Sequence, residues 1–189
     1  MIQVLIDDAC VRKLKRELKV AGSREMGGVL AAENLGNGQF RIVAMSFQRS
    51  GGSVASFVRD PLFHRRFMRR FMARTGNQPG RFNYFGEWHS HPSFVPLPSG
   101  TDIIQMQQLI RARDQVANFL VLLIAKLNSS GSVGASAHAF RRTYPPLQLT
   151  VISGDETKLH DQGGRLRITP KEFQALRREQ STFSQGATR

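Results

Sequence analysis

The segment from residue 82 to residue 110 most constrains how this chain can fold, because it predicts a strand, a sharp break and a helix in that order. Residues 82–88 are rich in aromatic side chains, as is typical of a β-strand, and they lead into His89, Ser90, His91 and Pro92. Pro92 has no N–H and cannot continue a strand ladder. Since side chains alternate along a strand, His89 and His91 should project from the same face at its C-terminal end.

A helix is predicted directly after the proline-rich loop at residues 93–98. Ser99 is a suitable N-cap and Asp102 then occupies the third helical position, as in a capping box with Asp in place of Glu. The apolar residues that follow have helical spacing. A carboxylate held by backbone amides at a helix start has a fixed position, which suits a metal ligand as well as a cap. Both roles stay open for Ser99 and Asp102.

The residues His89, His91 and Asp102 form a candidate metal site. Two imidazole nitrogens and one carboxylate oxygen are a ligand set of catalytic Zn²⁺, which keeps a fourth position open for water. Two histidines at this spacing are a weak signal by themselves. The serine, the proline and the later Asp102 strengthen it, and we therefore predict that Zn²⁺ is the cofactor.

Hydrolysis at such a site also needs a general base. Zinc lowers the pKa of its bound water from 15.7 to about 7, so that a neighbouring carboxylate can accept the proton. The candidates are Glu25, Glu33 and Glu87. Glu87 would share a strand face with the histidines, whereas Glu25 precedes a glycine-rich strand. Residue chemistry alone leaves Glu25 and Glu87 equally good, and Glu25 could also be a simple surface charge.

The full pattern, His-x-His-x7-Ser-x2-Asp, resembles the signature of the JAMM (JAB1/MPN/Mov34) zinc peptidases, which include deubiquitinases. The stretch from Glu25 to Leu30 is similar to the Glu-x-Gly-Gly-x-Leu strand start of that family. The resemblance implies that Glu25 is the general acid/base and that Ser99 helps to hold the oxyanion. It spans residue 25 to about residue 142. It implies an α/β (α+β) fold, with a mixed curved β-sheet flanked by helices and related to cytidine deaminases.

Within that family, the chain looks like the bacterial JAB proteins encoded beside ubiquitin-like, E1-like and E2-like proteins, including those of antiphage operons. The resemblance implies a deubiquitinase-like isopeptidase that cleaves after the C-terminal tail of a ubiquitin-like protein, maturing it or removing it from targets. E1-like and E2-like proteins are implied as further partners. We expect the tail to be extended, to end in a small residue and to pair with a sheet edge.

Two other functions are considered. A RadC-like JAB protein with a nucleic-acid-linked role would have asparagine and glycine around its histidines, where this chain has Ser90 and Phe94. A non-catalytic MPN scaffold would have lost metal ligands that this chain keeps. The sequence therefore favours the isopeptidase.

The remaining elements follow from periodicity and turn residues. One domain is expected over residues 1–178, with a flexible tail at residues 179–189, and Thr169 should start a last helix through a capping box. Strands are predicted at residues 2–6, 26–32, 40–47, 82–89, 118–127, 132–141 and 147–152, and helices at residues 8–20, from about 61 to 76, from 99 and from 169.

Composition points to a cytoplasmic protein that does not enter a membrane. No apolar run approaches the ~20 residues that span a bilayer, and we expect no signal peptide. The one cysteine, Cys10, cannot form an internal disulfide, which fits a reducing compartment, and it should be a small buried residue rather than a nucleophile.

The net charge of +13 is unusual and lies mainly on two predicted helices, residues 8–20 and 61–76. Such a charge fits nucleic acid, a membrane surface or an acidic protein. In the second helix, Phe63, Phe67 and Phe71 have the spacing of a core face rather than of a base-stacking platform. We therefore expect solvated basic faces, with nucleic acid possible but not favoured. His138, in a predicted strand, is expected to be hydrogen-bonded rather than to bind a second metal.

Overall fold

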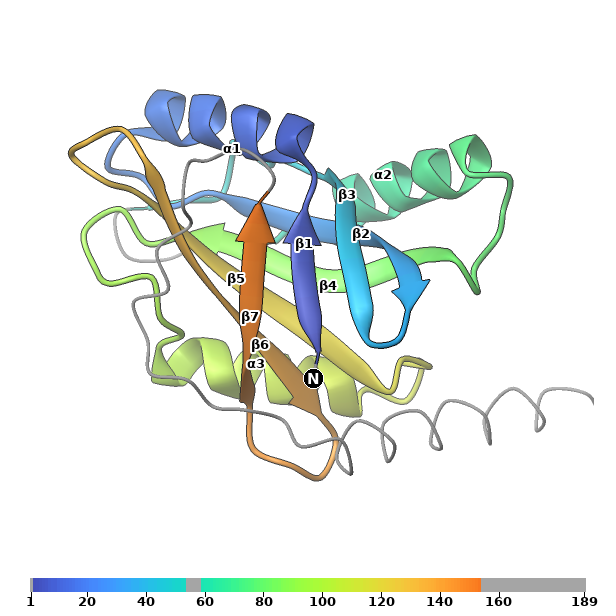
Figure 1. Cartoon of the computed structure of the whole chain (residues 1–189). Helices are drawn as coiled ribbons and strands as arrows, with labels where there is room; N and C mark the ends of the chain where they lie inside the picture. Colours follow the sequence, from blue (N-terminus) through green and yellow to red (C-terminus); the bar gives the residue numbers. More distant parts are fainter. Residues whose placement is uncertain (1, 54–58, 154–189) are drawn as a thin grey trace, which may run out of the picture.

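The computed structural model describes residues 2–53 and 59–153, which form seven strands and three helices (Figure 1). The capping box predicted at Thr169, the domain limit at residue 178 and the tail lie outside these residues. In chain order the elements are β1 (Gln3–Ile6), α1 (Asp8–Ala21), β2 (Gly27–Gly36), β3 (Gln39–Met45), α2 (Pro61–Arg74), β4 (Phe82–Ser90), α3 (Gly100–Arg111), β5 (Phe119–Leu127), β6 (Val133–Arg141) and β7 (Leu147–Ser153).

The strands form one mixed sheet in the order β1-β3-β2-β4-β5-β6-β7. Pairing is parallel between β1 and β3, β1 and β7, and β4 and β5, and antiparallel elsewhere. The predicted mixed sheet flanked by helices is confirmed. What the sequence did not predict is closure: the short strand β1 pairs with both β3 and β7, so the curved sheet becomes a closed barrel.

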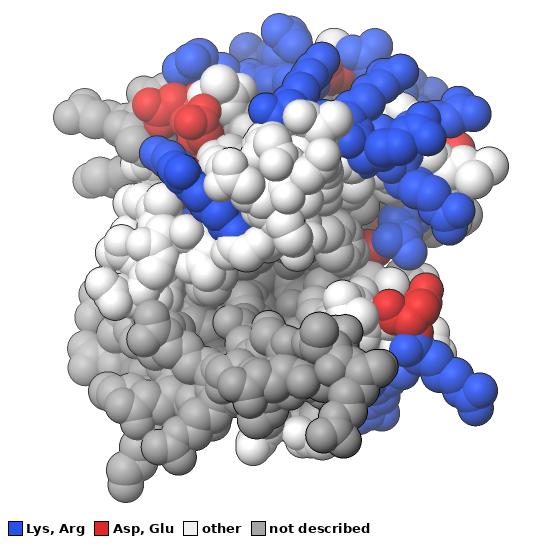
Figure 2. Space-filling view, turned by 90° about the vertical axis from the view of Figure 1, so that its right-hand side faces the viewer, with Lys and Arg blue, Asp and Glu red and all other residues white. Residues whose placement is uncertain are grey.

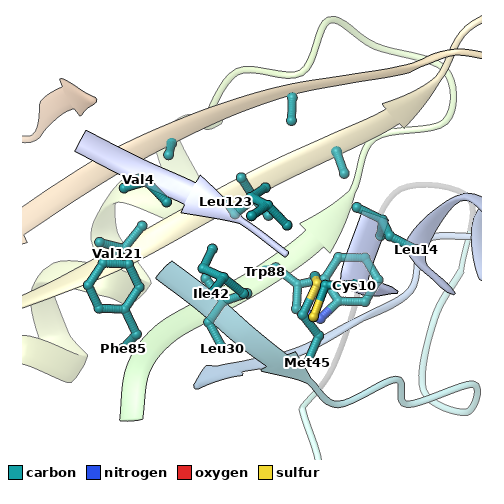
Figure 3. Packing of buried hydrophobic residues seen from close by; sticks show 14 of the residues in the cluster. Val4, Cys10, Leu14, Leu30, Ile42, Met45, Phe85, Trp88, Val121 and Leu123 are labelled. Atoms are coloured by element: carbon teal, nitrogen blue, oxygen red, sulfur yellow. The ribbon is translucent and has the colours of Figure 1, made fainter. Parts of the chain in front are cut away.

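The inside of the barrel is the main hydrophobic core (Figure 3). Val121 and Leu123 of β5 point inward beside Trp88 of β4. Helix α1 covers this core with its buried face, which includes Leu14 and Cys10. Burial, followed by the negative charge of Asp7, raises the pKa of Cys10 to about 11. The thiolate is therefore disfavoured, as expected for a packing residue rather than a nucleophile.

The other two helices cover outer faces of the sheet. Met106 and Ile110 of α3 pack on outward-facing residues of β5 and β6, among them Leu122. Helix α2 contacts β2 and β4. Its buried residues are His64 and Phe71, whereas Phe63 is 41% exposed. The prediction that Phe63 faces inward is therefore wrong, because the helix is rotated so that His64 is buried in its place. Among the described residues, no helix is long and apolar enough to cross a membrane.

An irregularity at Gly86 sets the faces of β4. Gly86 has a φ of +142°, and a Cβ there would lie 1.9 Å from the Val121 carbonyl oxygen. The pairing of β2 with β4 shifts register beside it. Because of this irregularity, Phe85 and Trp88 both reach the core although they are three residues apart. Side chains alternate again after Trp88, so the side chain of His89 lies on the outer face of the barrel.

His64 is buried in a hydrogen-bond network that fixes α2 to the barrel. Its Nε2 lies 3.1 Å from Gln48 Oε1, which can only accept, so Nε2 carries the proton. Its Nδ1, 2.9 Å from Ser46 Oγ, then accepts the serine proton. Ser46 Oγ in turn accepts from the Val29 N–H at 2.8 Å. A neutral His64 satisfies every partner, and a charged one would not.

We expect the stability of the protein to fall as the pH falls from 6.5 to about 4. Burial, followed by the charge of Arg59, lowers the pKa of His64 from 6.5 to about 4, and burial lowers that of His138 from 6.5 to about 4. In this window the unfolded chain binds more protons than the folded chain, so protonation favours unfolding; below pH 4 these two groups add no further loss. At 1.36 kcal/mol per pKa unit, the combined loss is several kcal/mol. Urea unfolding across this range measures it, and a His138→Leu variant should show a shallower dependence. An unchanged slope in that variant would contradict this assignment.

Candidate metal and catalytic site

The structure brings His89, His91 and Asp102 together, although they come from two elements. His89 is the last residue but one of β4, His91 directly follows that strand, and Asp102 lies in the first turn of α3. The Nε2 atoms of the two histidines are 3.1 Å apart. Asp102 Oδ1 lies 3.2 Å from Nε2 of His89, and Oδ2 lies 3.6 Å from Nε2 of His91. Among the described residues, this is the group of side chains that could hold a metal ion.

These donor separations fit a tetrahedral zinc ion. With metal–donor distances of roughly 2.0–2.2 Å, the donors of a tetrahedral site are about 3.3–3.6 Å apart. The observed 3.1, 3.2 and 3.6 Å lie close to that range. The side chains of His89, His91 and Asp102 are 13, 9 and 13% exposed, so the group is largely buried but still reaches solvent. Three protein donors, two nitrogens and one oxygen, are the ligand number of a catalytic rather than a structural zinc site.

Neighbouring groups orient two of the three donors. His91 Nδ1 lies 3.3 Å from the Val95 carbonyl oxygen, to which it donates, so Nε2 is the ring nitrogen that faces the other donors and would bind a metal once its proton is lost. The predicted capping box is present: the Asp102 N–H donates to Ser99 Oγ, while the Ser99 N–H donates to Asp102 Oδ2 at 2.7 Å. The Ser99 hydroxyl also donates to Asp102 Oδ2, at 2.7 Å. Asp102 therefore has a fixed orientation before any metal binds.

The hydrogen bonds within this group shift the pKa values of Asp102 and His91. Burial alone would raise the pKa of Asp102, but hydrogen bonds from His89 and His91, with help from Ser99, hold it well below its usual range. The hydrogen bond to Asp102 raises the pKa of His91 despite burial. The carboxylate is thus ionised and concentrates negative charge between the two rings, where a cation would bind.

Glu25 is held beside this group by its backbone. Ser90, which lies between the two histidines, is buried, and its Oγ accepts from the Met26 N–H at 3.0 Å, while its N–H donates to the Met26 carbonyl at 2.8 Å. On the other side, the Glu25 N–H donates to the Ser53 carbonyl at 2.7 Å. Gly52 allows this approach, because a Cβ there would lie 1.8 Å from the Glu25 carbonyl oxygen.

The environment of the Glu25 carboxyl is that of a candidate base. Burial raises its pKa, and the charges that act on it next are those of His89, His91 and Asp102. Its side chain is therefore within electrostatic reach of all three candidate ligands. An exposed surface charge at the end of α1, the simplest alternative, is excluded because Glu25 is only 7% exposed.

Glu87 has other partners. Its carboxylate forms an ion pair with Arg59 and accepts a hydrogen bond from the Tyr84 hydroxyl at 3.4 Å. Burial raises its pKa, and the charge of Arg59 opposes that shift. Glu33, the third candidate, is buried at the far end of β2 and pairs with Arg41 and Arg81. Of the three carboxylates, Glu25 is the one without a basic partner among the described residues.

Sequence reasoning missed Ser90 and Arg59. Ser90 holds the backbone next to Glu25 beside the histidines, through its hydrogen bond with the Met26 N–H, and Arg59 forms an ion pair with the carboxylate of Glu87. A signal for Ser90 was present, since a polar residue between two outward-facing histidines must face inward and find partners there. The expectation that His138 is hydrogen-bonded is not met at its Nδ1 atom. This atom is buried and has no hydrogen-bond partner in the described part of the chain.

Comparison with known proteins identifies the family of this chain. The model of the Prok-JAB family, described as prokaryotic homologs of the JAB domain, matches residues 7–142. These residues contain all five candidate site residues. The chain therefore belongs to the Prok-JAB family.

The individual relatives and solved structures share between 16 and 27% of their residues with this chain. The chain is similar to a protein of Enterobacter hormaechei subsp. hoffmannii (strain UCI 50) named CD-NTase/cGAS isopeptidase, with 27% identity over 157 residues, 79% of this chain and 81% of that protein. The solution structure of DSY2949 from Desulfitobacterium hafniense shares the fold with a TM-score of 0.61 and 16% identity, covering 85% of this chain and 99% of that one. AF2198 of Archaeoglobus fulgidus, a JAB1/MPN domain protein, overlaps with a TM-score of 0.42, 16% identity, and coverage of 79% and 98%.

Proposed function

We propose that this protein is a zinc-dependent isopeptidase of the deubiquitinase-like kind. The observation that carries the proposal is the convergence of His89, His91 and Asp102 at donor distances that suit zinc, with the buried Glu25 beside them. Membership of the Prok-JAB family and the similarity to a named isopeptidase support it. A non-catalytic scaffold is disfavoured, because such a protein would not need a preorganised ligand set.

In this proposal His89, His91 and Asp102 hold the zinc. When bound, zinc would lower the pKa of a water molecule and polarise the scissile carbonyl. Glu25 accepts the proton of the attacking water as the new C–O bond forms. It then gives that proton to the leaving nitrogen as the C–N bond breaks, so that a free carboxylate and a free amine are released. The raised pKa of Glu25 suits a group that must both accept and return a proton.

The Ser99 hydroxyl can donate a hydrogen bond to the oxyanion while the Ser99 backbone N–H still holds Asp102. Asp102 Oδ2 accepts from both the hydroxyl and the backbone N–H of Ser99, each at 2.7 Å. If the hydroxyl turns toward the substrate carbonyl, the N–H still holds the carboxylate. We propose that this double contact lets Ser99 donate to the developing negative charge while the ligand stays in place.

The substrate is proposed to be the C-terminal tail of a bacterial ubiquitin-like protein that is joined to a target protein. The name of the Enterobacter relative, CD-NTase/cGAS isopeptidase, supports a conjugate of this kind. The expected pairing of the tail with a sheet edge is not supported, because within the described residues every strand already has a neighbour on both sides of the closed barrel. The tail would contact exposed apolar residues near the site instead: Phe94 and Val95, 57 and 58% exposed, and Ile104, 60% exposed.

The biological setting is part of the same proposal. E1-like and E2-like proteins would form the conjugates that this enzyme removes, in the cytoplasm and in an antiphage system.

The test is cleavage of a bacterial ubiquitin-like protein fused through its C-terminus to a reporter. We expect mass spectrometry to show one cut, after the last residue of the modifier, with activity lost on chelation and restored by added zinc. A fusion with tryptophan as the last modifier residue is the matched control and should be cut far more slowly. Cleavage that persists with a chelator, or equal cleavage of an unrelated unfolded protein, would refute the proposal.

A further inference from the structure

The exposed face of α2 carries a concentration of positive charge that the proposed isopeptidase chemistry does not use. All five arginines of the helix are exposed, and its sequence contains no acidic residue. No carboxylate in the described part of the chain lies within ion-pair distance of any of them. This face, called here the α2 arginine face, consists of Arg65, Arg66, Arg69, Arg70 and Arg74.

The arginines repeat along the helix rather than being scattered. Arg66, Arg70 and Arg74 are four residues apart, and Arg65 and Arg69 form a second row beside them. Like charges at this spacing repel each other and destabilise a helix. The opposite side of α2 is fixed to the barrel through His64 and Phe71, so the helix cannot turn these charges apart. The repulsion would be relieved by an anionic partner that spans the rows.

Neighbouring surface extends the same charge. Figure 2 shows Lys and Arg side chains gathered over the upper part of the molecule, where Figure 1 places α1 and α2. On α1, Arg12, Lys13, Arg16 and Lys19 are exposed. The one acidic residue in the middle of α1, Glu17, is buried and accepts two hydrogen bonds from Arg49 at 2.9 and 3.0 Å. It therefore does not interrupt the basic surface.

We propose that the α2 arginine face binds the phosphate backbone of a double-stranded nucleic acid without reading its sequence. At 1.5 Å per residue, the arginines of one row are about 6 Å apart. Neighbouring phosphates of one duplex strand advance about 3.4 Å along the axis and also wind around it, so their separation is of the same order as that of the arginines in a row. A regular row of one sign matches a uniform polyanion better than a folded protein surface, where charges of both signs are mixed. Guanidinium groups also bind phosphate oxygens in pairs.

The test is fluorescence anisotropy of the full chain with a short labelled DNA duplex at increasing salt. Each phosphate neutralised contributes about −0.9 to the slope of log K against log salt. We expect the double variant R66E/R70E to bind at least tenfold more weakly and to have a slope shallower by about 2. Its melting temperature should be unchanged or slightly higher, because like-charge repulsion is removed.

The matched control is R111E/R113E, which makes the same charge change at exposed arginines at the end of α3 and beyond it. It should keep the wild-type slope. Equal losses in both double variants, or no duplex binding at low salt, would overturn the proposal. So would displacement of the duplex by poly-glutamate at equal charge, since an acidic protein would then be the better partner. Neither double variant touches the candidate metal group, so these outcomes are independent of the isopeptidase proposal.

Discussion

Replacing Glu25 by Gln should lower the turnover of the conjugate substrate by about 10²–10⁴-fold or more, while zinc stays bound. Gln keeps the size of the side chain and its backbone hydrogen bond to Ser53, but it cannot accept the proton of the attacking water. Substrate affinity should change little. Turnover is measured on the modifier fusion, together with the zinc content of the same preparation.

Two other carboxylates provide the controls for this substitution. Glu87→Gln removes the ion pair with Arg59, and Glu33→Gln removes pairs with Arg41 and Arg81. Both variants should lose stability yet keep most of their turnover. A collapse of turnover in Glu87→Gln with normal turnover in Glu25→Gln would show that Glu87 is the base, which is the alternative that residue chemistry alone had left open.

Loss of either histidine ligand should remove the zinc and all measurable activity without unfolding the protein. In His89→Ala or His91→Ala only two protein donors remain, which is fewer than catalytic zinc sites use. The fold should persist because the ligands lie on the outside of a barrel whose core is built from other residues. Zinc content and circular dichroism of each variant give the two readouts.

His138→Ala is the matched control, since it removes a histidine of the same protein that lies outside the candidate metal group. It should keep the zinc and the activity. Full zinc occupancy in His89→Ala, or zinc loss in His138→Ala, would show that the ligands have been wrongly assigned.

Local patterns predicted the local parts of the site. The aromatic run before His89, the break at Pro92 and the cap formed by Ser99 and Asp102 are each encoded within a few residues, and each is present in the structure. The strands predicted at residues 26–32 and 40–47 are present as β2 and β3, although β2 continues to Gly36 and β3 already ends at Met45. Asn37 and Gly38, both with positive φ, complete the turn in two residues.

The parts that were missed depend on contacts between distant segments. Closure of the barrel depends on β1, a strand of only four residues, whose two parallel partners are about 40 and 150 residues along the chain. The choice between Glu25 and Glu87 depends on Ser90 and Arg59, whose side chains could find their partners only in the folded chain. The rotation of α2 that exposes Phe63 follows from the buried hydrogen bonds of His64, which helical periodicity does not reveal.

The most direct test of the zinc centre is X-ray absorption at the zinc edge of the purified full chain. His89, His91 and Asp102 with one water predict a shell of four nitrogen and oxygen atoms at roughly 2.0–2.2 Å, with the imidazole scattering of two histidines. A sulfur neighbour at about 2.3 Å, or a chain that binds no zinc, would contradict the account.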